Sequence, residues 1–416
     1  MDKGTVSTTM EKVRRLAVTK QHLAGEVPPS PTAEDILSVV RDLPYVQWDP
    51  VPAIAPSHII SLWSRLGSFR TSDLDALLWR EKKLLQHWAP IAMIVPTEEY
   101  PLYASLMARY PESLTKSWGS QRARAKKFLA EHAALRKSIL AQLGGGPLQL
   151  SQFKEHAKTK KKPDGWSSGS DVSTMLYHLQ MGGEAMVVGH QGNQNVWGAT
   201  EASLPGWADR TPLPEQEFER AAALRAIRAL GTASPSEITF YFVRGRYQNL
   251  KRALDRLLDE SVIRRVRVAE LGDRDVRYIS DQDVQLLQSM GSDAWQPRTT
   301  LIAPFDNLIS GRARTNRLFG FDYAHEQFLP AEKRKFGTFV LPILSGERLI
   351  GRADVLMDRE NRKLLVNSVH AEPGAPQDRQ VSTKIGETME ELAGFLGAEA
   401  VTYTSRVPPA WKSSLR

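Results

Sequence analysis

The most informative absence in this sequence is cysteine. None of the 416 residues is a cysteine, which excludes disulfide bonds, thiolate nucleophiles, cysteine-ligated zinc and cysteine-held iron–sulfur clusters. Long apolar runs are also missing, because no stretch reaches the roughly 18 apolar residues of a membrane-spanning helix. Residues 1–20 are charged and lack the apolar segment of a secretory signal. These absences predict a cytoplasmic or nucleoid-associated protein with no membrane partner.

Several short motifs of catalysis and cofactor binding are absent as well. The sequence has no Walker-type phosphate loop, no Gly-x-Gly-x-x-Gly segment and no Gly-x-Ser-x-Gly nucleophile elbow. His58 and His87 have no partner at a metal-binding spacing such as His-Glu-x-x-His, which favours hydrogen-bonded histidines over metal ligands. The sequence therefore predicts neither a cofactor nor a metal ion.

What the sequence does contain is a modest excess of basic residues. Lysine and arginine number 55 against 47 acidic residues, a formal net charge of +8. This excess favours polyanions, with nucleic acid ahead of an anionic membrane, although many soluble proteins are mildly basic without such a partner. Apolar residues make up 41% of the chain, an ordinary fraction for packed domains, and the length suggests two to four domains of roughly 100–200 residues.

The first third of the chain is dominated by helical patterns that end at the glycine run before Pro147. Thr32 precedes acidic residues and an apolar repeat of helical spacing, which predicts a helix that begins there and stops before Pro44. Further helices are expected at 10–23, 57–66, 71–85 and 118–143.

Two later segments share one order of elements, with helices followed by a pair of strands. This order is typical of a winged helix–turn–helix, and it recurs after about 75–80 residues. The first segment has expected helices at 150–158 and 170–180 and strands at 184–189 and 195–200; the second has helices at 215–230, from 234 and at 249–258, and strands at 262–269 and 276–279.

From Thr299 the pattern changes to strands. Strands are expected at 301–304, 338–344, 348–354 and 363–369, with a closing helix at 381–396 and a frayed tail from Arg406. The predicted fold is α+β, with tandem winged helices followed by a small β-barrel. The predicted domains are winged helix 1 with a catalytic loop (1–146), winged helix 2 (147–214), winged helix 3 (215–290), and the barrel with the C-terminal helix (291–416).

Gln47-Trp48-Asp49 is the strongest candidate for chemistry. In an extended segment the amide and the carboxylate point the same way. Cleavage of an N-glycosidic bond has oxocarbenium character, which a carboxylate can stabilise while it accepts a proton from water. A neutral amide can hold that water, and an N7-alkylated purine is already cationic and leaves without protonation. The structural alternative is that Asp49 merely forms a turn before Pro50.

Two basic clusters are candidate DNA contacts. One is the turn with Lys160, Lys161 and Lys162, and the other is the expected helix with Lys251 and Arg252. Each lies in a winged-helix pattern, where a basic helix or turn can reach phosphates. The alternative for both is a solvated charged face.

Three groups of residues resemble a known family. These are Val46–Val51 with Ser57-His58 and Trp63–Gly67; Trp166–Ser170 leading into Gly183–Val187; and Ala303–Leu308 followed by Arg312, Arg314 and Arg317–Tyr323. Over about residues 11 to 370 the chain resembles the AlkZ/YcaQ-type winged-helix DNA glycosylases. Two positions depart from the family pattern: Pro56 stands where an arginine is common, and Pro90 where a histidine is expected.

The resemblance implies three winged helices plus a β-barrel, and excision of alkylated purines from double-stranded DNA by a monomer, with crosslink unhooking in some members. Gln47 and Asp49 match the Gln-x-Asp active-site form, with Asp49 as base and electrostatic stabiliser and Gln47 positioning water. No lysine nucleophile is assigned, although Lys82 and Lys83 stay open, so hydrolysis without strand cleavage is expected. The DNA contacts implied are Ser57, His58, Arg65, Arg312 and Arg314.

Two rival functions fit the basic winged helices equally well. A transcription regulator would bind one operator sequence and release no base. A passive damage binder would shield lesions without excising them, and the two proline departures are compatible with it. Binding to damaged against undamaged duplex separates the regulator from the other two.

Overall fold

The structure is a computed structural model of the whole chain. It describes residues 4–51, 53–88, 91–115, 119–154, 170–272, 274–291, 293–404 and 406–415. The chain divides into two compact units, each built from separate stretches of sequence: unit 1 holds residues 1–73, 224–242 and 254–416, and unit 2 holds residues 74–223 and 243–253. The division falls inside three helices, α4 (Thr71–Asp75), α10 (Glu215–Leu230) and α12 (Leu250–Asp259).

Unit 1 begins with three helices, α1 (Met10–Lys20), α2 (Ala33–Asp42) and α3 (Ser57–Leu66). The start of α2 is fixed by a capping box, in which the Thr32 hydroxyl accepts from the Asp35 amide and the Asp35 side chain accepts from the Thr32 amide. The helix expected from Thr32 is therefore confirmed, and so is the one at 57–66. Pro56 is the residue before α3, where a missing N–H removes no helical hydrogen bond.

A four-stranded sheet in unit 1 joins the start of the sequence to strands from residues 232–280. Its order is β1 (Thr5–Thr8), β9 (Ile263–Val268), β10 (Arg277–Ser280) and β8 (Thr232–Ala233), with β1 parallel to β9. Helix α1 packs on this sheet through a buried cluster that includes Val13, Leu16, Val266 and Ile279. The strand β1 was not expected from the sequence, because its residues show little apolar alternation.

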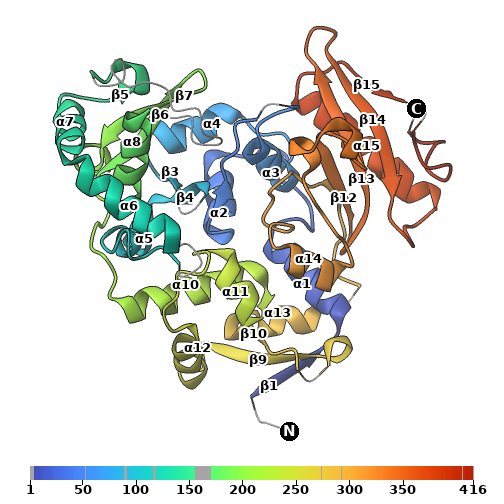
Figure 1. The fold of residues 1–416 in the computed structure, drawn as a ribbon. Coiled ribbons are helices and arrows are strands. Elements are labelled where there is room, and N and C mark those ends of the chain that lie inside the picture. Colours follow the sequence, from blue (N-terminus) through green and yellow to red (C-terminus); the bar gives the residue numbers. More distant parts are fainter. Residues whose placement is uncertain are drawn as a thin grey trace. The chain divides into compact units, whose positions relative to one another are not determined.

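The strands of the last quarter form a curled, open sheet of five (Figure 1). Its order is β11 (Thr299–Leu301), β12 (Val340–Ser345), β13 (Arg348–Asp358), β14 (Lys363–Ala371) and β15 (Ala400–Tyr403), and α15 (Arg379–Phe395) packs against both edge strands. The expected change to strands from Thr299 and the closing helix are confirmed. The expected barrel is an open sheet within the described residues, since no pairing joins β11 to β15.

The C-terminal tail is not frayed, contrary to expectation. Trp411 is 1% exposed and Leu415 is 2% exposed. The Trp411 indole donates a hydrogen bond of 2.9 Å to the Pro376 carbonyl oxygen. An indole that buries its ring and satisfies its N–H anchors the segment that carries it.

Unit 2 corrects two of the expected helices. The stretch 71–85 divides into α4 (Thr71–Asp75), a π-helix (Ala76–Arg80) and the start of β3 (Leu84–Trp88), which pairs with β4 (Ala92–Pro96). The long helix expected to Leu143 is two helices, α6 (Gly119–Glu131) and α7 (Ala133–Leu143), which meet at His132.

The rest of unit 2 follows the predicted order. After α5 (Tyr100–Met107) and the two helices of the corrected pair comes α8 (Asp171–Met181), and then the sheet β5–β7–β6. Its strands are β5 (Leu148–Gln149), β6 (Ala185–Gln191) and β7 (Gln194–Ala199). At 150–152 the chain forms a short 3-10 turn rather than the start of a longer helix, and residues 155–169 lie outside the described part.

The second predicted repeat has α10, then α11 (Pro235–Tyr241), then α12, followed by β9 and β10. Ser234 and Glu237 form a capping box at the start of α11, where a helix was predicted from 234. The four predicted domain boundaries remain predictions. Among the described residues no helix is both long and apolar enough to cross a membrane.

Candidate active site

The segment between α2 and α3 carries the Gln47–Asp49 pair. Tyr45 and Val46 are buried, each at 1% exposure, whereas Gln47, Trp48 and Asp49 are partly exposed. Val46 and Gln47 form the short strand β2. The chain therefore leaves the core after Val46. The buried residues before this point anchor the segment, and the Gln47 amide and the Asp49 carboxylate are accessible to solvent.

The Asp49 carboxylate is held on both of its oxygen atoms. The Ser57 hydroxyl donates to Oδ2 at 2.9 Å, and the Val51 amide donates to Oδ1 at 3.3 Å. The Ser57 amide also donates to the Asp49 carbonyl oxygen at 3.2 Å. The turn before Pro50 that the structural alternative predicts is thus present, and the same contacts fix one orientation of the carboxylate.

The side chain between the two polar residues turns the other way and stacks. The Trp48 ring lies on the His58 ring, with centroids 4.2 Å apart and planes 14° apart. His58 is 4% exposed and Ser57 is 1% exposed. Ser57 and His58 were expected to contact DNA; in the structure both are buried, and their side chains contact Asp49 and Trp48 of the candidate segment.

A histidine that sequence reasoning missed lies near Asp49. The negative charge of Asp49 acts to raise the pKa of His325, but burial has the larger effect and lowers the pKa below its ordinary value. Its Nε2 lies 2.8 Å from the Gln327 Oε1, and its Nδ1 is buried without a hydrogen-bond partner among the described residues. Because an amide oxygen only accepts, the proton belongs on Nε2 and the lone pair on Nδ1.

Aromatic rings surround His325 on several sides. Phe305 meets it edge-on at 5.0 Å between centroids, and Phe328 does so at 5.7 Å. Phe328 is 62% exposed, and Phe305 has a left-handed backbone with φ of 65°. The one signal in the sequence was position: His325 comes two residues after the Arg317–Tyr323 segment, which is part of the family resemblance.

The start of the segment is tied down by Asn307. Its amide Nδ2 donates to the Tyr45 carbonyl oxygen and to the Tyr241 hydroxyl, both at 3.0 Å. The Tyr241 hydroxyl in turn donates to the Leu43 carbonyl oxygen at 3.2 Å. This buried network satisfies the backbone just before Gln47, which limits the motion of the candidate catalytic residues.

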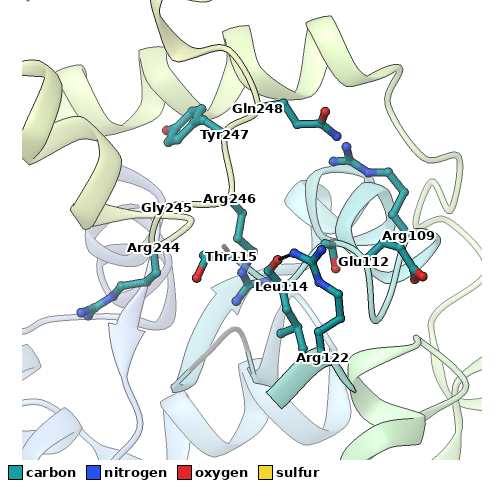
Figure 2. Close-up of a pocket in the computed structure, with 11 residues that line it drawn as sticks. Arg109, Glu112, Leu114, Thr115, Arg122, Arg244, Gly245, Arg246, Tyr247 and Gln248 are labelled. Atoms are coloured by element: carbon teal, nitrogen blue, oxygen red, sulfur yellow. Dashed lines mark hydrogen bonds between the residues drawn. The ribbon is translucent and has the colours of Figure 1, made fainter. Parts of the chain in front are cut away.

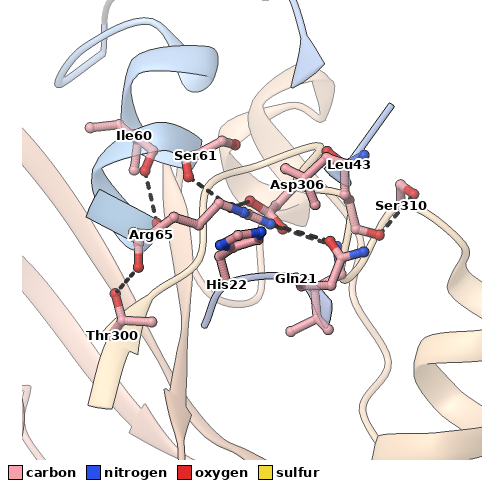
Figure 3. A network of polar contacts seen from close by, with 12 residues as sticks. Gln21, His22, Leu43, Ile60, Ser61, Arg65, Thr300, Asp306 and Ser310 are labelled. Carbon is pink, nitrogen blue, oxygen red and sulfur yellow. Dashed lines mark hydrogen bonds and ion pairs between the residues drawn. The ribbon is translucent and has the colours of Figure 1, made fainter. Parts of the chain in front are cut away.

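Helix α3 is fastened to the same stretch by a buried ion pair. Arg65 donates to both oxygens of Asp306, at 2.6 and 2.9 Å, and both side chains have no exposed surface. Arg65 also donates to the Ser61 carbonyl oxygen and to Gln21 (Figure 3). Arg65 was expected to contact DNA; the structure does not support this, because the guanidinium is already engaged in the core by Asp306, Ser61 and Gln21.

Arg314 needs the same correction. It is 7% exposed and donates to Glu237 at 2.6 Å and to the Thr232 and Leu230 carbonyl oxygens. Burial lowers the pKa of Arg314, while the charge of Glu237 opposes this. Its role is to hold the start of α11 rather than to contact DNA.

The other expected DNA contacts stay predictions. Arg312, Lys251 and Arg252 are exposed. Arg312 lines a mainly apolar cavity of about 440 Å³ whose wall includes Asn307 and Tyr241. Lys160, Lys161 and Lys162 lie outside the described residues, as does Pro90. In the described part of the chain no group of three or more histidine, aspartate or glutamate side chains is arranged to hold a metal ion.

Comparison with known proteins identifies the family. A family model described as DNA glycosylase AlkZ-like matches residues 40–395. The chain belongs to the AlkZ-like DNA glycosylase family. The solved structure of the Streptomyces sahachiroi DNA glycosylase AlkZ has the same fold, with a TM-score of 0.67 at 15% sequence identity, covering 96% of this chain and all of that one. In this AlkZ-like chain the matched residues include Gln47, Asp49 and His325.

Proposed function

We propose that this AlkZ-like chain is a monofunctional DNA glycosylase that hydrolyses the N-glycosidic bond of alkylated purines of the N7-alkylguanine type. The observation that carries the proposal is the Asp49 carboxylate, partly exposed yet fixed on both oxygens by Ser57 and Val51. A carboxylate fixed before the substrate arrives can stabilise charge without reorganising at the moment of reaction.

The reaction balances with one carboxylate and one amide. The bond between the sugar C1′ and the purine N9 breaks, and its electron pair leaves with the cationic alkylpurine, which becomes neutral. Asp49 stabilises the positive charge that develops at C1′. Water held by Gln47 bonds to C1′, and its proton passes to Asp49.

His325 supports this assignment through its charge state. Burial lowers its pKa, so the ring is neutral at pH 7. A cationic imidazole beside Asp49 would stabilise the carboxylate and weaken it as a base. A neutral ring near Asp49 does not offset the negative charge of the carboxylate. The oxocarbenium ion that develops in the reaction needs this charge for its stabilisation.

The contacts of Lys82 and Lys83, the two lysines that the sequence left as possible nucleophiles, support hydrolysis without strand cleavage. Lys82 donates to the Ser203 carbonyl oxygen at 2.6 Å, and Lys83 pairs with Glu81 at 3.0 Å. A lysine nucleophile needs an amine that is free to attack the sugar carbon, and these contacts engage both amines.

DNA binding by winged helices is part of the same proposal. The order α10, α11, α12, β9, β10 is that of a winged helix, and Lys251 and Arg252 are exposed near the start of its third helix. Exposed basic residues at that place are suited to phosphate contact. We expect a monomer acting on double-stranded DNA, with interstrand crosslinks as an additional substrate.

The test is release of the base from duplex DNA carrying N7-methylguanine, with alkali to reveal abasic sites, and from a nitrogen-mustard crosslink. We expect Asp49→Asn to lose at least about 100-fold in rate and Gln47→Ala to lose less, both with DNA binding retained. Asp322→Asn, the same change at an exposed residue of unit 1, should keep full activity. Tight binding by the wild type without release from either substrate would favour the regulator or the damage binder instead.

A further inference from the structure

Unit 2 contains an arginine-lined cavity that the proposed base excision does not use. It has a volume of about 600 Å³. Its charged lining residues are four arginines and one glutamate: Arg109, Arg122, Arg244, Arg246 and Glu112. In Figure 2, Arg246 and Arg122 extend toward the same region from two separate segments, whereas Arg244 turns away.

Arg246 is the unusual member. It is 6% exposed, and its Nε and Nη2 are buried without a hydrogen-bond partner among the described residues. No ion pair joins it to a carboxylate of that part of the chain. A buried guanidinium ordinarily forms hydrogen bonds to a carboxylate or to carbonyl oxygens, because desolvation without compensation costs several kcal/mol. An unpaired one therefore indicates that a negative group outside the chain completes the site.

The nearby carboxylates are already engaged elsewhere. Glu112 pairs with Lys126 at 2.6 Å, and Glu215 pairs with Arg109 at 3.1 Å. The buried Glu219 accepts from the backbone amides of Gln248 and Asn249, at 2.5 and 2.7 Å. The charge on Arg246 is thus left without compensation from these three acids.

The backbone on both sides of Arg246 is fixed, which orients its side chain toward the cavity. Arg244 and Gly245 both have left-handed backbones, with φ of 49° and 82°. A left-handed arginine is unfavourable by itself and persists where the surroundings impose it. The Glu219 contacts fix the following residues, so the turn at 244–245 and the anchor at 248–249 hold the Arg246 side chain between them.

We propose that this cavity binds a phosphate group, with Arg246 and Arg122 as its main ligands. Guanidinium groups match the geometry and charge of phosphate oxygens, and Arg122 brings donors to the same region (Figure 2). The phosphate comes from one of two sources, the backbone of a nucleic acid strand or a free polyphosphate. The first source rests on the proposed DNA glycosylase function; the second does not.

The binding test uses sodium pyrophosphate and the full chain without DNA, measured by calorimetry and by thermal unfolding. We expect pyrophosphate at ten times its Kd to raise Tm by roughly 3 to 6 °C. Arg246→Met should lose this response and at least tenfold in affinity. Arg210→Gln, which removes an arginine of unit 2 outside the cavity, should bind like the wild type. No response in the wild type, or an unchanged response in Arg246→Met, overturns the proposal.

The melting temperature of Arg246→Met without anion shows whether this variant is folded. Without anion, Arg246→Met should melt no lower than the wild type, because it removes an uncompensated buried charge. If it melts well below, Arg122→Gln decides the matter by the same pyrophosphate measurement, and unchanged binding there overturns the proposal.

The source of the phosphate is found by competition with an undamaged duplex. Displacement of pyrophosphate by the duplex, with a salt slope for duplex binding that is lower by about one in Arg246→Met, assigns the site to a DNA phosphate. Pyrophosphate binding that the duplex leaves unchanged assigns it to a free polyphosphate. Since base release is not measured here, failure of this site and failure of the glycosylase proposal give separate results.

Discussion

One hydroxyl group determines how the Asp49 carboxylate is presented. Ser57 donates to Oδ2 through its side chain and to the Asp49 carbonyl oxygen through its amide. The amide contact belongs to the backbone and survives any substitution except proline. The hydroxyl contact does not, and a hydrogen bond to a charged group contributes roughly 1.5–3 kcal/mol. Ser57 is therefore a positioning residue for Asp49 rather than a DNA ligand.

We expect Ser57→Ala to lower the rate of base release roughly tenfold, which corresponds to a loss of about 1.4 kcal/mol of transition-state stabilisation. The loss should appear in kcat more than in KM, because Ser57 is buried and does not face the substrate. Ser57→Thr retains the hydroxyl and should recover most of the rate. Equal rates for Ser57→Ala and the wild type would show that the contact does not orient the carboxylate.

Single residues also show which features of the site could be predicted from the sequence and which could not. Gln47 and Asp49 could be chosen because their spacing is local. His325 could not be placed beside Asp49, because 276 positions separate the two and only the fold brings them near each other. Arg65 was taken for a DNA contact because a basic residue in a DNA-binding family suggests one. Its partner Asp306 is also remote in sequence, so the buried ion pair was not visible.

At the scale of elements, the connection between α3 and the segment after β11 controls the site. Arg65 comes from the last turn of α3, and Asp306 accepts from it on both oxygens. The first residue of α3 is Ser57, which holds Asp49. The ion pair fixes one end of the helix, and the other end carries the contact to the candidate base. A displacement of α3 is therefore expected to reach Asp49 directly.

We expect Asp306→Asn to destabilise the protein by about 3–5 kcal/mol, because it leaves the Arg65 guanidinium buried without its counter-charge. The double variant Arg65→Met with Asp306→Leu should recover much of this loss, since no buried charge then remains. Urea unfolding of Arg65→Met, Asp306→Leu and the double variant that combines them gives the coupling free energy. Additive effects, with no recovery in the double variant, would contradict a coupled buried pair.

Elements with local signals were predicted well, and elements that depend on partners were not. Thr32 and Ser234 cap helices through contacts within four residues, so α2 and α11 were found from the sequence. The stretch at 84–88 continues an apolar helical pattern, but it pairs with β4 as a strand. Short apolar runs fit both structures, and the hydrogen-bonding partner decides between them.

At the scale of the whole molecule, each unit is assembled from distant stretches of chain. Strand β1 at the start of the sequence adds to β9 of the predicted third domain. The N-terminal helix α1 contributes Val18 to a buried cluster with Ile302 and Leu344 of the β-rich region. Local sequence patterns do not reveal pairing between segments that are far apart in the chain. The sequence therefore predicted consecutive domains, and the interleaved arrangement of the two units was not foreseen.

The stability of unit 2 should depend on pH through His87. This histidine of β3 is 8% exposed and its ring lies 4.5 Å from the Tyr103 ring. Burial, helped by the charge of Arg246, lowers the pKa of His87 from 6.5 to about 3. Below about pH 6.5 the unfolded chain therefore binds a proton that the folded chain does not, so stability falls as the pH falls.

The size of this effect can be measured against a matched substitution. Between pH 8 and pH 5 we expect His87 to account for a loss of about 2 kcal/mol in the free energy of unfolding. His87→Phe keeps an aromatic ring beside Tyr103 and should make the pH dependence shallower by that amount. Parallel curves for the wild type and His87→Phe would mean that His87 takes up its proton without unfolding unit 2, through a local opening of β3.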